Sequence, residues 1–254
     1  MKTPERPFNK EPDKVYIGLT KGNLEKGIRE RLREIGIIVP EAGRRCTFPA
    51  ENDQSIIFRA RSSKEIPEAV ARGVVDLSIV GEDRIFDTGQ GERVVNYGSL
   101  NFSNKSDKPS RLVLAGRTGR FADVDELRGR RIATEYVNLT RQRLMEIFGF
   151  SESDTSGLVY SDGSTEGKIE SGEADAITDI SETGKSLGEN GLAEIVEIFQ
   201  SYPQIIANRE ALGLPNIGAR IEAIALKLRA TQITRTRQLA QRQMPTRQAT
   251  NCII

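Results

Sequence analysis

The sequence predicts an α/β protein made of two βαβ lobes with a ligand cleft between them, followed by a C-terminal helical tail. Three observations support this fold class. Short apolar runs alternate with segments in which apolar residues recur at helical spacing. The pattern ARGVVDLSIVGED at 71–83 returns as ESGEADAITDISE at 170–182, which indicates two similar lobes. Between them, 89–109 is rich in Gly, Asn and Ser and is the expected crossing.

The first lobe is expected to hold three strands and two helices. The strands are the apolar runs at 15–19, 56–58 and 74–80. One helix repeats Leu and Ile at helical spacing from Leu24 and stops at Gly36. The other has Pro67 in its first turn and Gly73 as its cap.

The second half repeats this order of elements. Strands are expected at 112–114, 131–134, 158–160, 174–178, 194–199 and 204–207, with a helix from Asn138 to Gly149. The alternation predicts parallel strands joined by right-handed crossovers. After Pro215, the Ile and Leu residues of 217–228 form one apolar stripe of a helix, and 245–254 is expected to be loose.

These elements divide the chain into four parts. Residues 1–14 are an N-terminal extension and 15–100 form lobe 1, which 185–212 complete. Residues 101–184 form lobe 2, and 213–254 form a basic helical tail. If the two repeats face each other, Glu82 and Asp83 lie across the cleft from Asp179 and Glu182. The alternative to two similar lobes is that the repeat reflects only a feature common to βαβ proteins, in which a residue that ends a helix precedes the next strand.

Composition narrows the chemistry. The chain has 254 residues, of which 37% are hydrophobic and 29% charged, with no His and two Cys. Mechanisms that need an imidazole are excluded, and two distant cysteines argue against a disulfide framework or a four-ligand zinc site. No apolar run is long enough for a membrane span and nothing directs export, so a cytoplasmic location is expected. Seven basic residues and one acid follow Ala219, which makes the tail the only candidate surface for nucleic acid.

The segment from Asp179 to Leu187 carries the clearest chemical signal. A buried strand ends at Asp179, and a Ser/Thr/Gly turn leads into a helix begun by Lys185 and Ser186. Free amides and hydroxyls at a helix N-terminus suit a monophosphate, and the carboxylate suits the hydroxyls of a sugar. The alternative is that Asp179 and Ser181 only cap the helix and that Lys185 is solvated.

Other cleft candidates follow the same logic. Gly163–Glu166 and Lys21–Asn23 are further turns between a strand and a helix, with small or anion-friendly residues. Three arginines at strand ends are candidates for binding phosphate through two guanidinium N–H groups each: Arg59, Arg61 and Arg111. Tyr136 is a candidate for stacking a base, against the alternative of a core tyrosine.

Seven segments in this order resemble the ATP phosphoribosyltransferase family. They are LTKGNLEKGI, AENDQSIIFRAR, EIPEAVARGVVDLSIVGED, RRIATEYVNLT, DGSTEG, ADAITDISETGKSLGENGL and IIANREAL. The resemblance implies a bilobal fold like that of type II periplasmic binding proteins. It also implies transfer of phosphoribose from phosphoribosyl pyrophosphate to N1 of ATP, the first step of histidine biosynthesis, with Mg²⁺ carried by the substrate phosphates and not by side chains.

The resemblance also implies roles for individual residues. Lys21, Glu166 and Asp179 are the expected catalytic residues. The expected substrate-binding residues are Arg61, Glu82, Arg111, Tyr136, Ser164, Thr165, Ser181, Glu182, Thr183, Gly184, Lys185 and Ser186.

Two alternatives stay open at this point. Val137, 101–110 and 168–173 depart from the family pattern near the ATP side, which is compatible with a paralogue that uses another acceptor. A non-catalytic small-ligand-binding or regulatory relative is the other alternative. A homo-oligomer is expected, with a separate regulatory subunit resembling histidyl-tRNA synthetase, because 42 residues after Leu212 are too few for a regulatory domain. Membrane and nucleic-acid partners are not expected, since basic termini are more often solvated.

Overall fold

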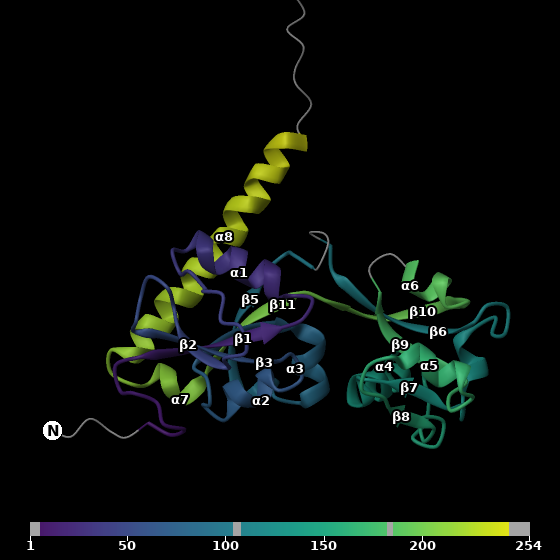
Figure 1. The fold of residues 1–254 in the computed structure, drawn as a ribbon. Coiled ribbons are helices and arrows are strands. Elements are labelled where there is room, and N and C mark those ends of the chain that lie inside the picture. Colours follow the sequence, from purple (N-terminus) through teal and green to yellow (C-terminus); the bar gives the residue numbers. More distant parts are fainter. Residues whose placement is uncertain (1–5, 104–107, 182–184, 244–254) are drawn as a thin grey trace, which may run out of the picture.

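The computed structural model has two lobes and one long C-terminal helix that projects beyond the first lobe (Figure 1). It describes residues 6–103, 108–181 and 185–243, with side chains as far as residue 236. Lobe 1 comprises the sheet of β1–β5 and β11 with helices α1, α2, α3, α7 and α8. Lobe 2 comprises the sheet of β6–β10 with helices α4, α5 and α6.

The elements of lobe 1 have the bounds β1 (Val15–Lys21), α1 (Glu25–Glu34), β2 (Thr47–Pro49), β3 (Ile56–Ser62), α2 (Ile66–Ala71), β4 (Leu77–Gly81), α3 (Glu82–Thr88), β5 (Val94–Ser99), β11 (Pro203–Asn208), α7 (Arg209–Leu212) and α8 (Ile217–Gln243). Those of lobe 2 are β6 (Ser110–Arg117), β7 (Ile132–Thr134), α4 (Val137–Phe148), β8 (Leu158–Tyr160), α5 (Thr165–Glu170), β9 (Ala176–Ser181), α6 (Lys185–Glu189) and β10 (Leu192–Ser201). Two short 3₁₀ turns, η1 (Gly91–Arg93) and η2 (Val124–Leu127), lie in the connections.

Lobe 1 has a six-stranded sheet in the order β2-β3-β1-β4-β11-β5, with helices on both faces. Alternation along β4 sends Leu77 and Ile79 into the core under α1 and α8, whereas Val80 joins the core under α2 and α3. The stripe predicted at 217–228 is confirmed, because Ile217, Ile221, Ile224 and Leu228 of α8 belong to the first of these cores. A buried sheet with apolar residues on both faces explains the continuous apolar runs in the sequence.

Lobe 2 has a five-stranded sheet in the order β10-β6-β9-β7-β8. Leu112 and Leu114 of β6 pack on the side of α4, and Val113 and Ala115 pack on the side of α5 and α6. The predicted helix ends as expected, since Gly149 has a φ of 64° in the left-handed region that closes α4.

The sheets are mixed, which corrects the expectation of parallel strands throughout. Strand β6 runs antiparallel to both β9 and β10, and β11 runs antiparallel to β4 and β5. Parallel neighbours need a crossover connection, which the chain provides only inside each lobe. The chain reaches β6 from lobe 1 and β11 from lobe 2. Neither strand therefore follows a βαβ crossover within its own lobe.

The boundary between the lobes also differs from the sequence-based expectation. Residues 185–201 do not complete lobe 1, because β10 pairs with β6 from Leu192 to Ser201. The chain returns to lobe 1 only at Tyr202, between β10 and β11. The predicted crossing at 89–109 is shorter than expected, since 94–99 form β5 at the edge of the first sheet. The sequence pattern did not indicate β5, because a register shift and a glycine interrupt the alternation of apolar residues along this strand.

The repeated sequence motif corresponds to a repeated structure. In lobe 1, α2 ends at Gly73 and Asp76 precedes β4; in lobe 2, α5 ends before Gly172 and Asp175 precedes β9. Both glycines have a positive φ, of 74° and 76°. The strand expected at 74–80 begins only at Leu77, because the amides of 74 and 75 still bond to Ala69 at the end of α2.

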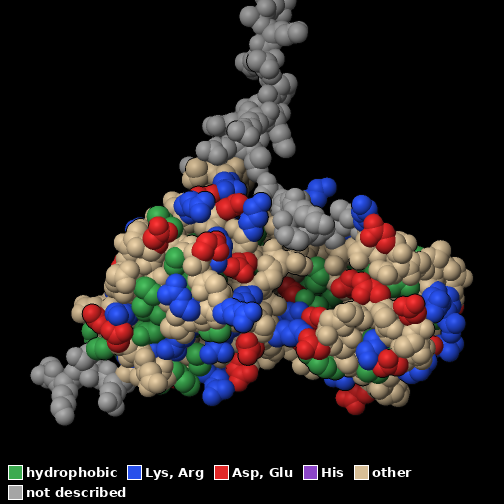
Figure 2. All heavy atoms as spheres, in the orientation of Figure 1, with side chains coloured by type: hydrophobic (Ala, Val, Ile, Leu, Met, Phe, Trp, Pro, Cys, Tyr) green, Lys and Arg blue, Asp and Glu red, His purple; other side chains and the backbone are tan. Residues whose placement is uncertain are grey.

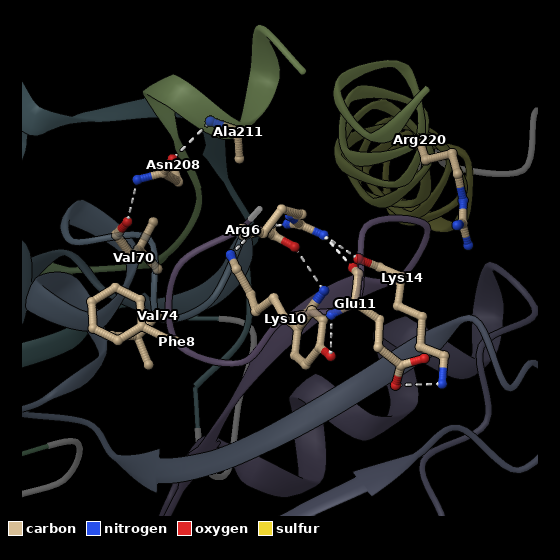
Figure 3. Close-up of polar contacts among 12 residues, drawn as sticks. Arg6, Phe8, Lys10, Glu11, Lys14, Val70, Val74, Asn208, Ala211 and Arg220 are labelled. Atoms are coloured by element: carbon tan, nitrogen blue, oxygen red, sulfur yellow. Dashed lines mark hydrogen bonds and ion pairs between the residues drawn. The ribbon is translucent and has the colours of Figure 1, made fainter. Parts of the chain in front are cut away.

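The N-terminal segment covers the start of the lobe 1 sheet (Figure 3). Arg6 donates to the main-chain carbonyls of Glu11 and Lys14, and the ammonium of Lys14 reaches Glu11. Arg6 and Lys10 are both buried. No helix within the described ranges is long and apolar enough to cross a membrane. The segment expected to be loose, 245–254, lies outside the described residues.

Candidate functional site

A cleft of about 460 Å³ lies between the two lobes, and side chains from both form its walls. Figure 2 shows acidic and basic side chains meeting where the lobes come together. The lining residues are Thr20, Lys21, Gly22, Asn23, Leu24, Ser63, Gly81, Asp83, Arg84, Ser110, Glu135, Tyr136, Thr178, Asp179, Ile180, Ser201 and Pro203. Of the four acids expected to face each other from the repeated motif, Asp83 and Asp179 line this cleft, Glu82 does not, and Glu182 lies outside the described residues.

The first wall is the turn after β1. Lys21 ends the strand with an exposed side chain, and Gly22 follows with a φ of 98°, which only glycine adopts without strain. Below it, the hydroxyl of Thr20 donates to the carbonyl of Ile79 at 2.6 Å and ties β1 to β4. The turn therefore presents a cation and exposed backbone on a rigid strand end.

Asp179 lies on the opposite wall, inside β9. The strand continues to Ser181, so Asp179 is not the strand's last residue as the sequence suggested. Its Oδ1 accepts the main-chain N–H of Ile180 at 2.8 Å. Burial, followed by the negative charge of Glu166, raises the pKa of Asp179 to about 6. The carboxylate is poised to accept hydrogen bonds from a ligand at neutral pH.

The turn before α5 leads to Glu166, whose negative charge contributes to the raised pKa of Asp179 although Glu166 does not line the cleft. Gly163 and Ser164 both have left-handed backbone conformations, with φ of 74° and 46°. Ser164 makes no capping bond through its side chain, while Thr165 is buried. A serine in this region is strained, and such strain is concentrated at functional turns. The side chain of Ser164 therefore does not cap α5.

Tyr136 lines the cleft, but the guanidinium of Arg84 covers one face of its ring at 3.9 Å. Its hydroxyl hydrogen-bonds to Asp83, and burial raises its pKa well above the ordinary value. Asp83 in turn accepts the hydroxyl of Ser201 at the crossing between the lobes. Tyr136 is thus a nearly buried side chain bonded to the other lobe, and its covered face is closed to a base in this arrangement.

The remaining predicted residues lie away from the cleft lining. Arg61 is 4.0 Å from Glu65, and Glu82 hydrogen-bonds to Gln204, where burial raises its pKa. Arg111 pairs with Glu194 at 2.7 Å and Glu197 at 3.2 Å on the neighbouring strand.

Of the loop that follows β9, only its two ends are described. Ser181 is buried at the end of the strand. Lys185 and Ser186 begin α6, where the ammonium of Lys185 is exposed and 3.8 Å from Glu189. Glu182, Thr183 and Gly184 lie outside the described residues.

Sequence reasoning missed two charged lining residues, Arg84 and Glu135. Neither belongs to a periodic pattern or a glycine turn, so only the approach of the two lobes gives them a role. It also missed the hydroxyl groups of Ser63, Ser110 and Thr178. Thr178 belongs to a buried cluster with Thr134 and Thr140, which supports the floor of the cleft below Asp179.

Among the described residues, no group of three or more acidic or cysteine side chains could hold a metal. The carboxylates among the residues that line the cleft belong to Asp83, Glu135 and Asp179. In proteins, a Mg²⁺ ion that keeps several waters is commonly bound by one or two carboxylates together with phosphate groups of a ligand.

Comparison with known proteins gives a consistent answer. The family model described as ATP phosphoribosyltransferase matches residues 62–230. The ATP phosphoribosyltransferase of Desulforudis audaxviator is 34% identical over 203 residues, which are 80% of this chain and 67% of that protein.

Solved structures extend the comparison to the fold. The ATP phosphoribosyl transferase (HisG:HisZ) complex from Thermotoga maritima gives a TM-score of 0.67 at 25% identity, covering 85% of this chain and 97% of the other. The periplasmic aliphatic sulphonate binding protein SsuA from Escherichia coli gives a TM-score of 0.60 at 17% identity, covering 91% and 76%. The second likeness concerns the fold alone and agrees with the expected two-lobed architecture.

Proposed function

This chain belongs to the ATP phosphoribosyltransferase family, the transferases of the first step of histidine biosynthesis, and on that premise we propose that its cleft joins ATP to phosphoribosyl pyrophosphate. The observation that carries the proposal is the cleft in which Lys21 of lobe 1 and Asp179 of lobe 2 line opposite walls. Two phosphorylated substrates must meet there, and a cleft between lobes can hold one on each side.

The proposed reaction is a displacement at C1 of the ribose. The lone pair of adenine N1 forms the N1–C1 bond, and the C1–O bond breaks with its electron pair leaving on pyrophosphate. Mg²⁺ on the substrate phosphates supplies charge neutralisation for the leaving group. No imidazole base is needed, which fits a chain without histidine.

The residues act by positioning and electrostatics. Asp179 accepts the ribose hydroxyls, and Glu166 beside it adds negative charge near the carbon where positive charge develops. Lys21 and the turn after it bind phosphate oxygens as the negative charge moves onto pyrophosphate. Ser181 to Ser186 carry the 5-phosphate in this proposal.

Assembly and location belong to the same proposal. The similar structure from Thermotoga maritima is a HisG:HisZ complex, and we expect this chain to form a homo-oligomer with a separate regulatory subunit. A cytoplasmic location follows from the need for ATP.

The test is to incubate the purified chain with ATP, phosphoribosyl pyrophosphate and Mg²⁺. The formation of phosphoribosyl-ATP is followed by its absorbance. Asp179→Asn is the matched inactive variant. Turnover with another nitrogen base but not with ATP would identify a paralogue with a different acceptor. Calorimetric binding of phosphoribosyl pyrophosphate without turnover of any base would identify a ligand-binding relative and overturn the enzymatic proposal.

A further inference from the structure

Glu135 joins four segments from both lobes at the edge of the cleft. Its Oε2 accepts the guanidinium of Arg84 from α3 at 2.6 Å. Its Oε1 accepts the main-chain N–H of Gly163, from the turn between β8 and α5, at 2.8 Å. The ammonium of Lys64, from the connection between β3 and α2, lies 3.5 Å from Oε2. The carboxylate therefore connects its own turn, between β7 and α4, with two segments of lobe 1 and one other turn of lobe 2.

The contact between Arg84 and Glu135 is protected from water. Only 8% of the Arg84 side chain and 23% of the Glu135 side chain are exposed. The guanidinium is also stacked on the ring of Tyr136 at 3.9 Å, so its plane is fixed. A charge-assisted pair in this position resists salt and is costly to break from one side.

The exposed pair at the rim provides a contrast. Lys64 also pairs with Asp162, whose side chain is 73% exposed. Exposed ion pairs contribute little, because water and salt screen them. Glu135 is thus the buried ionic contact between the lobes, beside the amides of Asn138 and Leu139 that donate to Asp87. The rim pair is a natural control.

Glu135 also holds the turn that carries Glu166. Its bond to the Gly163 amide fixes a turn with two successive left-handed residues, Gly163 and Ser164. That turn leads directly into the first residues of α5, and Glu166 there acts electrostatically on Asp179. Movement of Glu135 would therefore move both the lobe spacing and the acidic pair of the cleft.

We propose that Glu135 is a positioning residue for the transfer reaction: through Arg84 it sets the spacing of the two lobes, and through the amide of Gly163 it orients the turn that presents Glu166 to Asp179. The proposal rests on the proposed function for its kinetic consequences. Its structural half, the spacing of the lobes, needs no substrate and is testable alone.

The first experiment is small-angle X-ray scattering of the full chain without substrate. We expect Glu135→Gln and Arg84→Met to increase the radius of gyration, and Asp162→Asn to leave it unchanged. Circular dichroism spectra that match the spectrum of the unmodified chain separate a change of lobe spacing from misfolding. An unchanged radius in Glu135→Gln would overturn the proposal whatever the activity of the chain.

The second experiment uses phosphoribosyl-ATP formation across pH. We expect Glu135→Gln to lower kcat/KM at least tenfold and Asp162→Asn to change it less than twofold. The carboxylate of Glu135 is also one cause of the raised pKa of Asp179, so its removal should move the acid limb of the profile to lower pH. That shift follows from the charge of Glu135 alone, so the orienting role is tested above the limb, where a merely structural residue would lower the amount of folded enzyme without changing kcat/KM. A kcat/KM of Glu135→Gln within twofold of the unmodified chain at pH 8 would overturn the orienting role even if the scattering result stood.

Discussion

The carboxylate of Asp76 accepts the main-chain N–H of Tyr16 at 2.8 Å, and lobe 2 repeats this contact between Asp175 and Arg131 at 3.2 Å. In both lobes the acid precedes a strand and holds the start of the neighbouring parallel strand. The two differ in their surroundings, because Asp76 is fully buried whereas Asp175 is paired with exposed arginines. Asp76 therefore depends on the N-terminal segment for its counter-charges.

Arg6→Met should destabilise the chain more than Lys10→Met. Arg6 pairs with Asp76 at 2.6 Å and also satisfies two main-chain carbonyls. Its loss should lower the free energy of unfolding by about 3–5 kcal/mol, the range for breaking a buried pair from one side. Lys10 contributes less, because burial lowers its pKa and makes its charge unfavourable in the folded state. Urea unfolding midpoints of the two variants decide the order, and equal losses would contradict it.

Asp179→Asn should raise stability while it removes activity. A folded pKa of about 6 against an ordinary value of 3.8 means that the charged form is disfavoured in the fold, by on the order of 1–3 kcal/mol at neutral pH. The amide removes that cost. Asp175→Asn is the matched control and should lower stability. Hydrogen bonds and ion pairs with Arg131 lower the pKa of Asp175 despite its burial, so its charged form is favoured in the fold. Thermal unfolding at pH 8 should show one variant above and one below the unmodified chain.

The acid limb of the activity profile should lie near pH 6. Asp179 must be charged to accept the hydroxyls of ribose, so kcat/KM should fall as pH drops through its raised pKa. The stability effect has the opposite direction. Between about pH 4 and 6 the folded state binds a proton that the unfolded state has lost, so the contribution of Asp179 to stability decreases as pH rises. The advantage of Asp179→Asn should therefore grow over this interval and level off above it; a constant difference would show that another group titrates.

The secondary structure elements could be predicted from local sequence patterns, whereas the contacts between the lobes could not. The end of α4 at Gly149 and the apolar stripe on α8 could be predicted because each depends only on residues within one short segment of the sequence. The antiparallel placement of β6 and β11 depends on where the chain crosses between lobes, which no local pattern encodes.

The same distinction applies to the candidate site. Lys21 and Asp179 follow directly from strand ends and turns and do line the cleft. Arg84 and Glu135 are ordinary charged residues in the sequence, and only their distance of 2.6 Å reveals the pair. Arg111 shows the converse, since its acidic partners lie 83 and 86 residues away, on β10.

Gly81→Ala should displace Asp83 from the cleft. A Cβ at residue 81 would lie 2.2 Å from Oδ1 of Asp83 and 3.4 Å from the hydroxyl of Ser201, so the carboxylate must leave that hydroxyl. The backbone itself accepts alanine, because φ is −60°. Activity should therefore fall tenfold or more with a stability loss of about 1–2 kcal/mol, typical of a lost buried hydrogen bond. Gly167→Ala is the control, since its Cβ meets nothing within 4 Å inside α5 and should stabilise the helix by about 0.5–1 kcal/mol. Full activity in Gly81→Ala, measured beside that control, would show that the position of Asp83 does not matter for the reaction.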